Sequence, residues 1–461
     1  MKAKIITTEL KINRTNTKGV IMKKSKRMIA TILTVVTLLT VTYIPAFATE
    51  VGIDDETLQI EATALLDKLL TEQFEANKTG TLIDTSDILA NTPGTTLYKQ
   101  YLYWYSGKCT ATQEYWTDYR YALDFDHIDD GMVIFNADLS YGRTCSKYNS
   151  EAYGYEYRIR LTEENGKFLI SDIDTEEMNF YGFKNRIAGG AENGIALMSD
   201  DIAPVSTDTL DAMIADYADM KETMSSMVID SADIVDMDAE HEAYMEAMLS
   251  GSIAEPAATS YSYDRERGRR YADLYYTESG RNTCFHNFGG KGGDCTNWVS
   301  QCVWAGYGGW TDGDSVATMK ANIKARKRMQ PSTNDTNWYG HENGAGYNWS
   351  NVSGFWNLVN SNPTTGPNGT GYYDNTLWST SGMKSTEVVT GQVLQVKDGE
   401  SGSYAHSAFV TGGTNDSFEN IKITQHSPFS RIMLDEFIDH WGGSSSCYMR
   451  QLKFSSANFD K

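Results

Sequence analysis

A cysteine stands where a helix is expected to begin, in the stretch GGDCTNWVSQCVWAG at residues 292–306. Asp294 is a favourable N-cap residue, the following apolar residues recur at helical spacing, and Gly306 is a typical helix end. The pattern predicts a helix whose first residue is Cys295. Free N–H groups and the positive end of the helix dipole stabilise an anion there. We therefore expect a lowered pKa for the Cys295 thiol, which would make the thiolate a nucleophile.

The alternative roles for this cysteine are half of a disulfide and a metal ligand. A disulfide to Cys302 is excluded by geometry, because seven residues along a helix separate the two by about 10 Å. Cys302 is expected to be a core residue, and whether Cys109 pairs with Cys145 stays open. The sequence has no CxxC pair and no close Cys–His spacing, so we expect no metal and no cofactor.

A cysteine nucleophile needs a base, and two of the seven histidines lie at the ends of a predicted hairpin. His406 opens the strand HSAFVTGG, TNDSFEN forms the turn, and IKITQHSP runs back to His426. If the turn is centred on Asp416, position 406 pairs with position 426 across the hairpin. Residues opposite one another in an antiparallel pair point to the same face of the sheet, with Cβ atoms about 4.5–5.5 Å apart. His426 is then expected to accept a hydrogen bond from His406 and to fix its tautomer.

Two rivals for this third position follow from the same hairpin. Asp416 lies at the tip of the turn, too far along the hairpin to reach His406. Gln425 should point to the opposite face, because successive strand residues alternate. A one-residue bulge in the hairpin would exchange Gln425 for His426.

Taken together, GGDCTNWVSQC, GQVLQV and AHSAFVTG resemble the Putative amidase domain family of secreted Gram-positive proteins, within the papain-like cysteine hydrolases. The resemblance covers about residues 261–455 and departs from the family at Gly391-Gln392, where Gly-Asp is expected. It implies an α+β fold in which the nucleophile helix packs on an antiparallel sheet. It also implies that Cys295 attacks an amide carbonyl while His406 takes its proton. The N–H of Cys295 would face the oxyanion, because the upstream Gln of papain-like enzymes is missing.

The rest of the chain divides by composition. After Met22, the expected start, a basic segment, an apolar run and Ala46–Phe47–Ala48 predict a secretory signal at residues 1–48. The alternative is a membrane anchor, but the run is 17 residues long, shorter than the ~20 that a spanning helix needs. Residues 49–185 predict a helix followed by a curved antiparallel sheet with a hairpin at Asn165-Gly166, and this pattern resembles nuclear-transport-factor-like domains. Residues 186–258 predict a helical acidic connector, and residues 259–461 the catalytic domain.

The charge composition of the chain excludes one class of binding partner. The net charge of −21 argues against nucleic acid, which needs clustered Lys and Arg, and nothing after the signal is expected to span a membrane. We predict a secreted, extracellular Cys–His amide hydrolase that acts through a thioester on an amide or peptide, with cell-wall peptidoglycan as a candidate substrate. Two alternatives stay open: an acyl transferase on the same scaffold, and a catalytically silent binding module. Tryptophans in residues 307–390 either line a substrate groove or, as we favour, pack loops onto the core.

Overall fold

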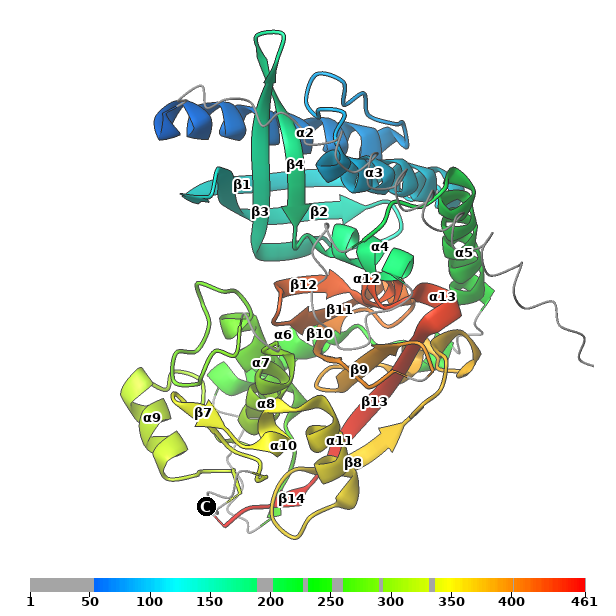
Figure 1. The fold of residues 1–461 in the computed structure, drawn as a ribbon. Coiled ribbons are helices and arrows are strands. Elements are labelled where there is room, and N and C mark those ends of the chain that lie inside the picture. Colours follow the sequence, from blue (N-terminus) through cyan, green and yellow to red (C-terminus); the bar gives the residue numbers. More distant parts are fainter. Residues whose placement is uncertain are drawn as a thin grey trace, which may run out of the picture. The chain divides into compact units, whose positions relative to one another are not determined.

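A ten-stranded sheet runs through the computed structural model, which describes residues 54–188, 202–226, 231–250, 260–289, 293–330, 336–400 and 402–460. Along this sheet the order is β1-β2-β3-β12-β11-β10-β9-β13-β8, with β4 paired to β3 (Figure 1). Every pairing within it is antiparallel, and helices surround it, so the fold is α+β as predicted. The predicted signal region lies outside the described residues. Within the described ranges, no helix has the length and apolar character needed to cross a membrane.

The first part of the sheet packs against long helices. In α2 (Asp55–Thr79), Ala62, Leu66 and Leu69 are buried at a spacing of three to four residues, which agrees with the helix predicted at the start of residues 49–185. Asn165 and Gly166 both have positive φ and close the hairpin of β3 and β4, as the Asn-Gly signal predicted. The elements of this part are α3 (Pro93–Thr112), β1 (Trp116–Asp129), β2 (Met132–Arg143), β3 (Ser150–Glu164), β4 (Lys167–Thr175) and α4 (Met178–Ala188).

The predicted connector contains two helices, α5 (Thr207–Ser226) and α6 (Met237–Leu249). Tyr217, Met220 and Met224 of α5 are buried in the same apolar cluster as Phe437, so this methionine-rich stripe packs into a core. Unlike a solvated linker, α5 therefore belongs to the folded body.

The remaining strands carry helices on both faces. On one face, α8 (Cys295–Gly306) packs Trp298 and Val299 against Phe409 of β10 (His406–Gly413). On the other face, α12 (Leu434–His440) packs Phe437 against Val410. The other elements are α7 (Arg265–Tyr275), α9 (Val316–Lys324), α10 (Tyr347–Ser350), α11 (Val352–Ser361), β8 (Asn368–Tyr372), β9 (Val393–Asp398), β11 (Ile421–Gln425), β12 (Phe429–Met433), α13 (Gly443–Ser446) and β13 (Cys447–Ser455), with short strands β5 (Ser260–Tyr261) and β14 (Ala457–Asn458) paired together and β6 (Gly340–His341) and β7 (Gly344–Ala345) likewise.

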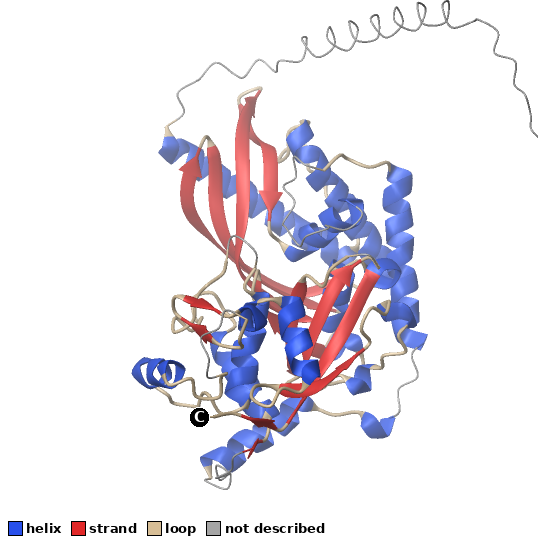
Figure 2. Cartoon of the chain, turned by 60° about the horizontal axis from the view of Figure 1, so that its bottom comes forward, coloured by secondary structure: helices blue, strands red, loops and turns tan. Residues whose placement is uncertain are grey.

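The two halves of the sheet join where β3 pairs with β12. Ser430 lies opposite Ala152, and Phe429 lies opposite Tyr153. The strands of the two predicted domains therefore form one sheet (Figures 1 and 2). The proposed boundaries at residues 185 and 258 stay a prediction.

Candidate active site

Cys295 is the first residue of α8, as predicted, and its side chain is buried with 4% of its surface exposed. The thiol contacts the Ala405 carbonyl oxygen at 4.0 Å and Thr296 Oγ1 at 3.8 Å. Thr296 Oγ1 in turn lies 3.1 Å from Ser407 Oγ. These contacts fix the helix start against the residues on either side of His406.

The thiol does not have the environment that the helix start alone predicted. Burial raises the pKa of the Cys295 thiol, because desolvation disfavours the thiolate. Hydrogen bonds from Thr296 and from the Ser407 backbone act in the opposite direction but do not reverse the shift. The expectation of a lowered pKa is therefore wrong for the structure as it stands, because desolvation outweighs the stabilisation that the helix start provides.

Asp294 occupies the N-cap position but does not cap the helix with its side chain. Its carboxylate accepts hydrogen bonds from the Phe288 N–H at 3.1 Å, from Asn297 Nδ2 at 2.8 Å and from His426 Nδ1 at 2.8 Å. The backbone N–H of Asp294 donates to Ser427 Oγ at 2.9 Å. Asp294 therefore ties the loop before Cys295 to the far end of the hairpin.

The other polar residues of the DCTNWVSQ run are used for packing the helix. Asn297 donates to the His286 carbonyl and accepts from Trp349 Nε1 at 2.7 Å. Ser300 donates to the Trp349 carbonyl at 2.8 Å, and Gln301 accepts from Tyr271 at 2.8 Å. These residues are structural, which leaves the thiol and the first N–H groups of α8 for chemistry. Trp310, Trp338, Trp349, Trp356 and Trp378 are all buried, which supports packing over a groove.

His406 begins β10 and lies on the face of the sheet that carries α12. Its ring centroid is 5.5 Å from that of Trp441 and 5.9 Å from that of Phe437. Its Nε2 donates to Gln425 Oε1 at 2.7 Å. Burial lowers the pKa of His406 to about 4, so the imidazole is neutral at physiological pH.

The structure brings Cys295 to the backbone that precedes His406 without joining the two side chains. Ser407 faces α8 through Thr296, and His406 faces α12. The thiol and the imidazole therefore approach the start of β10 from different sides. Among the contacts of the described residues, no hydrogen bond joins Sγ to the ring.

The expectation that His426 lies beside His406 is wrong, and the reason is a bulge. Phe409 lies opposite Thr424 and Val410 opposite Ile423, but Gly412 lies opposite Lys422, so the register shifts by one residue. His426 consequently points to the α8 face, where its ring stacks on Trp298 with centroids 4.1 Å apart. Burial lowers the pKa of His426, while the bond to Asp294 acts against that shift.

Gln425 takes the place that the sequence assigned to His426. It is fully buried, and its Nε2 donates to Ser430 Oγ at 3.0 Å while Oε1 accepts from His406. The alternation of side chains would have found Gln425 had the bulge been known. Glycines 412 and 413, both with positive φ, are the local signal for it.

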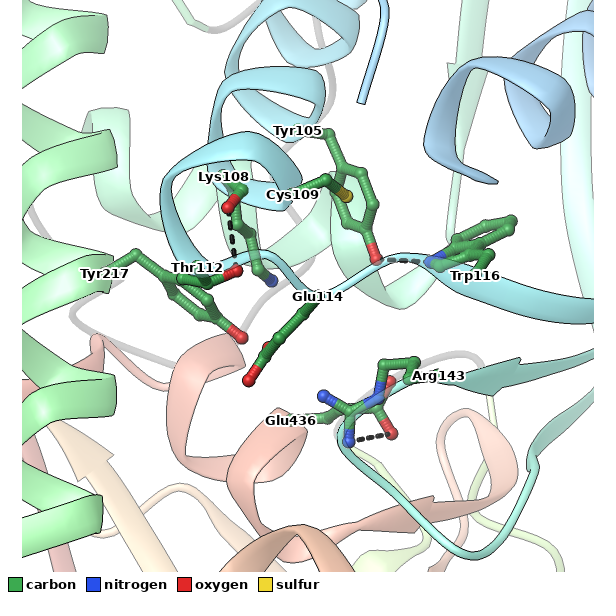
Figure 3. Close-up of a pocket in the computed structure, with 9 residues that line it drawn as sticks. All are labelled: Tyr105, Lys108, Cys109, Thr112, Glu114, Trp116, Arg143, Tyr217 and Glu436. Atoms are coloured by element: carbon green, nitrogen blue, oxygen red, sulfur yellow. Dashed lines mark hydrogen bonds and ion pairs between the residues drawn. The ribbon is translucent and has the colours of Figure 1, made fainter. Parts of the chain in front are cut away.

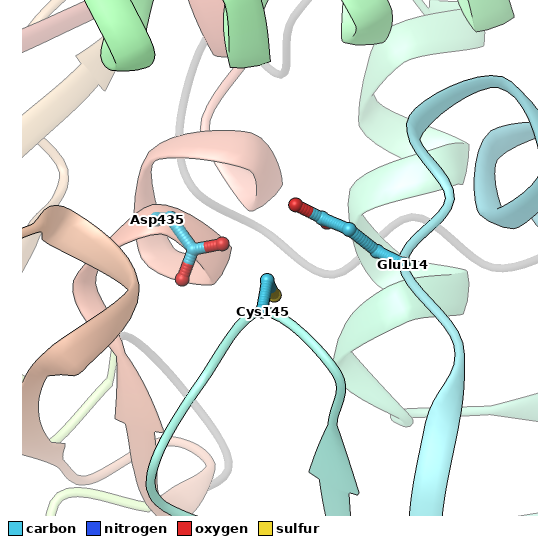
Figure 4. A group of neighbouring side chains, drawn as sticks. All are labelled: Glu114, Cys145 and Asp435. Carbon is cyan, nitrogen blue, oxygen red and sulfur yellow. The ribbon is translucent and has the colours of Figure 1, made fainter.

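One cluster of potential metal ligands among the described residues does not suit a metal ion. Glu114, Cys145 and Asp435 offer ligand atoms within 4.8 Å of one another (Figure 4). The Lys221 ammonium already lies 2.6 Å from Glu114 and 3.3 Å from Asp435, where it neutralises both carboxylates. Burial also raises the pKa of Cys145 to about 12, so its thiolate is not available as a ligand.

Two cavities lie away from Cys295 and His406. The first, of about 10 Å³, has room for a single water. Its lining residues come from α3, β2, α5, α12 and the segment around Glu114 (Figure 3). The second, of about 310 Å³, is lined by Cys145, Ser385 and Phe418 among others. Cys109 and Cys145 are both free, so they do not form the disulfide that the sequence left open.

Comparison with known proteins finds a match, which overlaps the region that the sequence predicts to be catalytic. A family model described as Putative amidase domain matches residues 262–445, which include Cys295, His406 and Gln425. The match covers less than half of the chain and indicates, at a general level, a hydrolase of amide bonds. No curated protein and no solved structure matches the chain.

Proposed function

We propose that the chain is a cysteine-dependent amide hydrolase in which Cys295 is the nucleophile, His406 the general base and Gln425 the residue that orients His406. One arrangement carries the proposal. The thiol begins a helix and lies against the carbonyl of the residue before His406, whose distal ring nitrogen is held by Gln425. Nucleophile, base and orienting amide are the three parts that acyl transfer through cysteine requires.

The protonation states define the first step. The thiol pKa is raised and the imidazole pKa is lowered, so both groups are neutral at rest. Gln425 Oε1 accepts from Nε2–H, which leaves the Nδ1 lone pair of His406 as the base. In the proposed step Nδ1 takes the thiol proton as sulfur bonds to the amide carbon. The two groups lie on different sides of β10, so this step requires their side chains to come together at the start of the strand when substrate binds.

The remaining steps follow from the same groups. The oxyanion is stabilised by the N–H of Cys295, which has no hydrogen-bond partner among the described residues. The C–N bond then breaks, and His406 returns the proton to the leaving amine. Water attacks the thioester, His406 removes its proton, and the carboxylic acid and free thiol are released.

We further propose that the hydrolase follows the papain-like scheme and acts outside the cell on a peptide of the cell wall. The support is the signal-like sequence of residues 1–48 and the acidic composition of the chain, together with the amidase family of secreted Gram-positive proteins that the motifs resemble. An amine acceptor in place of water would make the same thioester a transferase intermediate.

Labelling and product analysis test the proposal together. The full chain is incubated with a cysteine-directed acyl probe, then with peptidoglycan fragments and a peptide library, with and without an added amine. We expect labelling at Cys295, hydrolysis of an amide bond, and loss of both in Cys295→Ala. Cys302→Ala, which changes the other cysteine of α8, is the matched control and should keep activity. Hydrolysis that survives Cys295→Ala would overturn the assignment.

A further inference from the structure

The helix next to His406 buries three carboxylates. Asp435, Glu436 and Asp439 of α12 are exposed by 0%, 3% and 2% respectively. Carboxylates are almost never fully buried unless they are paired, so each of these must have a partner. Most of those partners come from residues 108–221, outside the region that matches the amidase family.

Asp435 is held by two cations. Arg143, at the end of β2, donates through Nη1 and Nη2 to both carboxylate oxygens at 2.7 Å. Lys221 of α5 lies 3.3 Å from the same carboxylate and also pairs with Glu114 at 2.6 Å. Figure 4 shows Glu114 and Asp435 with Cys145 between these segments. The bidentate Arg143 pair fixes the orientation of the first turn of α12.

The other two carboxylates also have their partners in the N-terminal part of the chain. Glu436 Oε1 accepts from Tyr141 at 2.6 Å, and Oε2 accepts from Ser150. Asp439 Oδ2 accepts from Lys108 at 2.7 Å, and Oδ1 pairs with Arg186. Figure 3 shows Lys108, Arg143 and Glu436 around the small cavity at this junction. Helix α12 is thus clamped along its length by β2, β3, α3, α4 and α5.

This clamp continues to the proposed base. Phe437 lies within α12 and Trp441 directly follows it, and both rings contact His406. A second route runs through Gln425, whose Nε2 donates to Ser430 Oγ at 3.0 Å and to Met178 Sδ at 4.0 Å. Met178 begins α4, and Ser430 is paired with Ala152 of β3.

The Met178 contact favours one orientation of the Gln425 amide. A thioether sulfur has no proton to donate, so its 4.0 Å contact is favourable only when the amino group of the amide faces it. The carbonyl Oε1 is then left for His406, whose Nε2 must carry a proton to donate to it. In this way the N-terminal part selects the tautomer that leaves Nδ1 free.

We propose that α3, β2, β3, α4 and α5 position the hydrolase site: their side chains hold His406 through the α12 clamp, and Met178 selects the Nε2–H tautomer of His406 through Gln425. The function of that tautomer rests on the proposed hydrolase, but the tautomer itself does not. Met178 and Arg143 are positioning residues, because each acts on His406 through another residue.

The tautomer is measured in the full chain labelled with ¹⁵N-histidine, by two-bond proton–nitrogen correlation, with His406→Gln used to assign the signal. We expect the wild type to carry the His406 proton on Nε2. Met178→Leu keeps the volume but removes the acceptor, and we expect a mixture of tautomers. Arg143→Met should lower kcat about tenfold with KM within twofold of wild type, and Arg143→Lys should restore part of the loss.

The matched control is Leu66→Ala, which deletes a fully buried side chain of α2, an element outside the clamp. It should lower the melting temperature while keeping the His406 tautomer and kcat. If Arg143→Met does not fold, Met178→Leu decides the proposal alone. An unchanged tautomer in Met178→Leu would overturn it. A changed tautomer in a chain that hydrolyses no amide would leave the positioning role standing and remove the proposed function.

Discussion

Gln425 Oε1 lies 2.7 Å from Nε2 of His406, so Gln425 is the neighbour of the proposed base. The sequence had placed His426 in that position. His426 faces the other side of the sheet, on Trp298 and Asp294. Substitutions of Gln425 and His426 are therefore expected to have different effects, although the two residues are adjacent in the sequence.

Gln425 should affect catalysis. Gln425→Ala removes the acceptor of the His406 proton, and we expect kcat to fall roughly tenfold to a hundredfold, a part of what general-base catalysis contributes. Gln425→Glu places a carboxylate next to the imidazole, which favours the imidazolium and should move the acid limb of kcat/KM to higher pH. Steady-state kinetics across pH measure both effects. Equal rates for Gln425→Ala and wild type would remove this residue from the site.

Asp294 and His426 should affect stability first. Asp294→Ala leaves the Phe288 N–H, the Asn297 amide and His426 without their buried acceptor. We expect the free energy of unfolding to fall by about 3 kcal/mol, as for a buried pair that loses one partner. Urea unfolding measures this change. His426→Phe keeps the stacking on Trp298, so its loss of stability should be smaller. The opposite ranking would show that the hydrogen bonds to the Asp294 carboxylate are not what stabilises the loop.

Cys295 should be dispensable for folding. Cys295→Ala removes one buried sulfur that forms neither a disulfide nor a cap, so we expect less than about 1.5 kcal/mol of destabilisation. Thermal unfolding and near-ultraviolet circular dichroism check that the variant is folded while hydrolysis is abolished. A variant that fails to fold would make Cys295 a structural residue.

The resting thiol should be protonated at neutral pH. Burial raises the pKa of Cys295 and lowers that of His406 to about 4, so no thiolate–imidazolium pair is expected. The thiolate absorbance near 240 nm, taken as the difference between wild type and Cys295→Ala, should be absent at pH 7 and emerge only in alkaline solution. A difference already present at pH 6 would restore the lowered pKa that the helix start predicted.

Stability should fall as the solution becomes acidic. Burial lowers the pKa of both His406 and His440 from 6.5 to about 4, so between these values the unfolded chain binds protons that the folded chain does not. The free energy of unfolding is therefore expected to decrease as pH falls from 6.5 towards 4. His440→Leu should reduce the slope by up to one proton, measured by urea titrations at several pH values. An unchanged slope would mean that His440 is protonated in the folded state.

The sequence by itself determined the features that depend on residues close together in the chain. Helical spacing located α2 and α8, the Asn-Gly pair located the hairpin of β3 and β4, and the DCTNWVSQ run placed Cys295 at a helix start. Only the tertiary structure determined the register of the β10–β11 hairpin and the pKa of the buried thiol. A one-residue bulge between Val410 and Gly412 exchanged His426 for Gln425, since a strand reverses its faces with each residue. Burial raised the thiol pKa that the helix start had been expected to lower, since desolvation depends on packing between segments far apart in the chain.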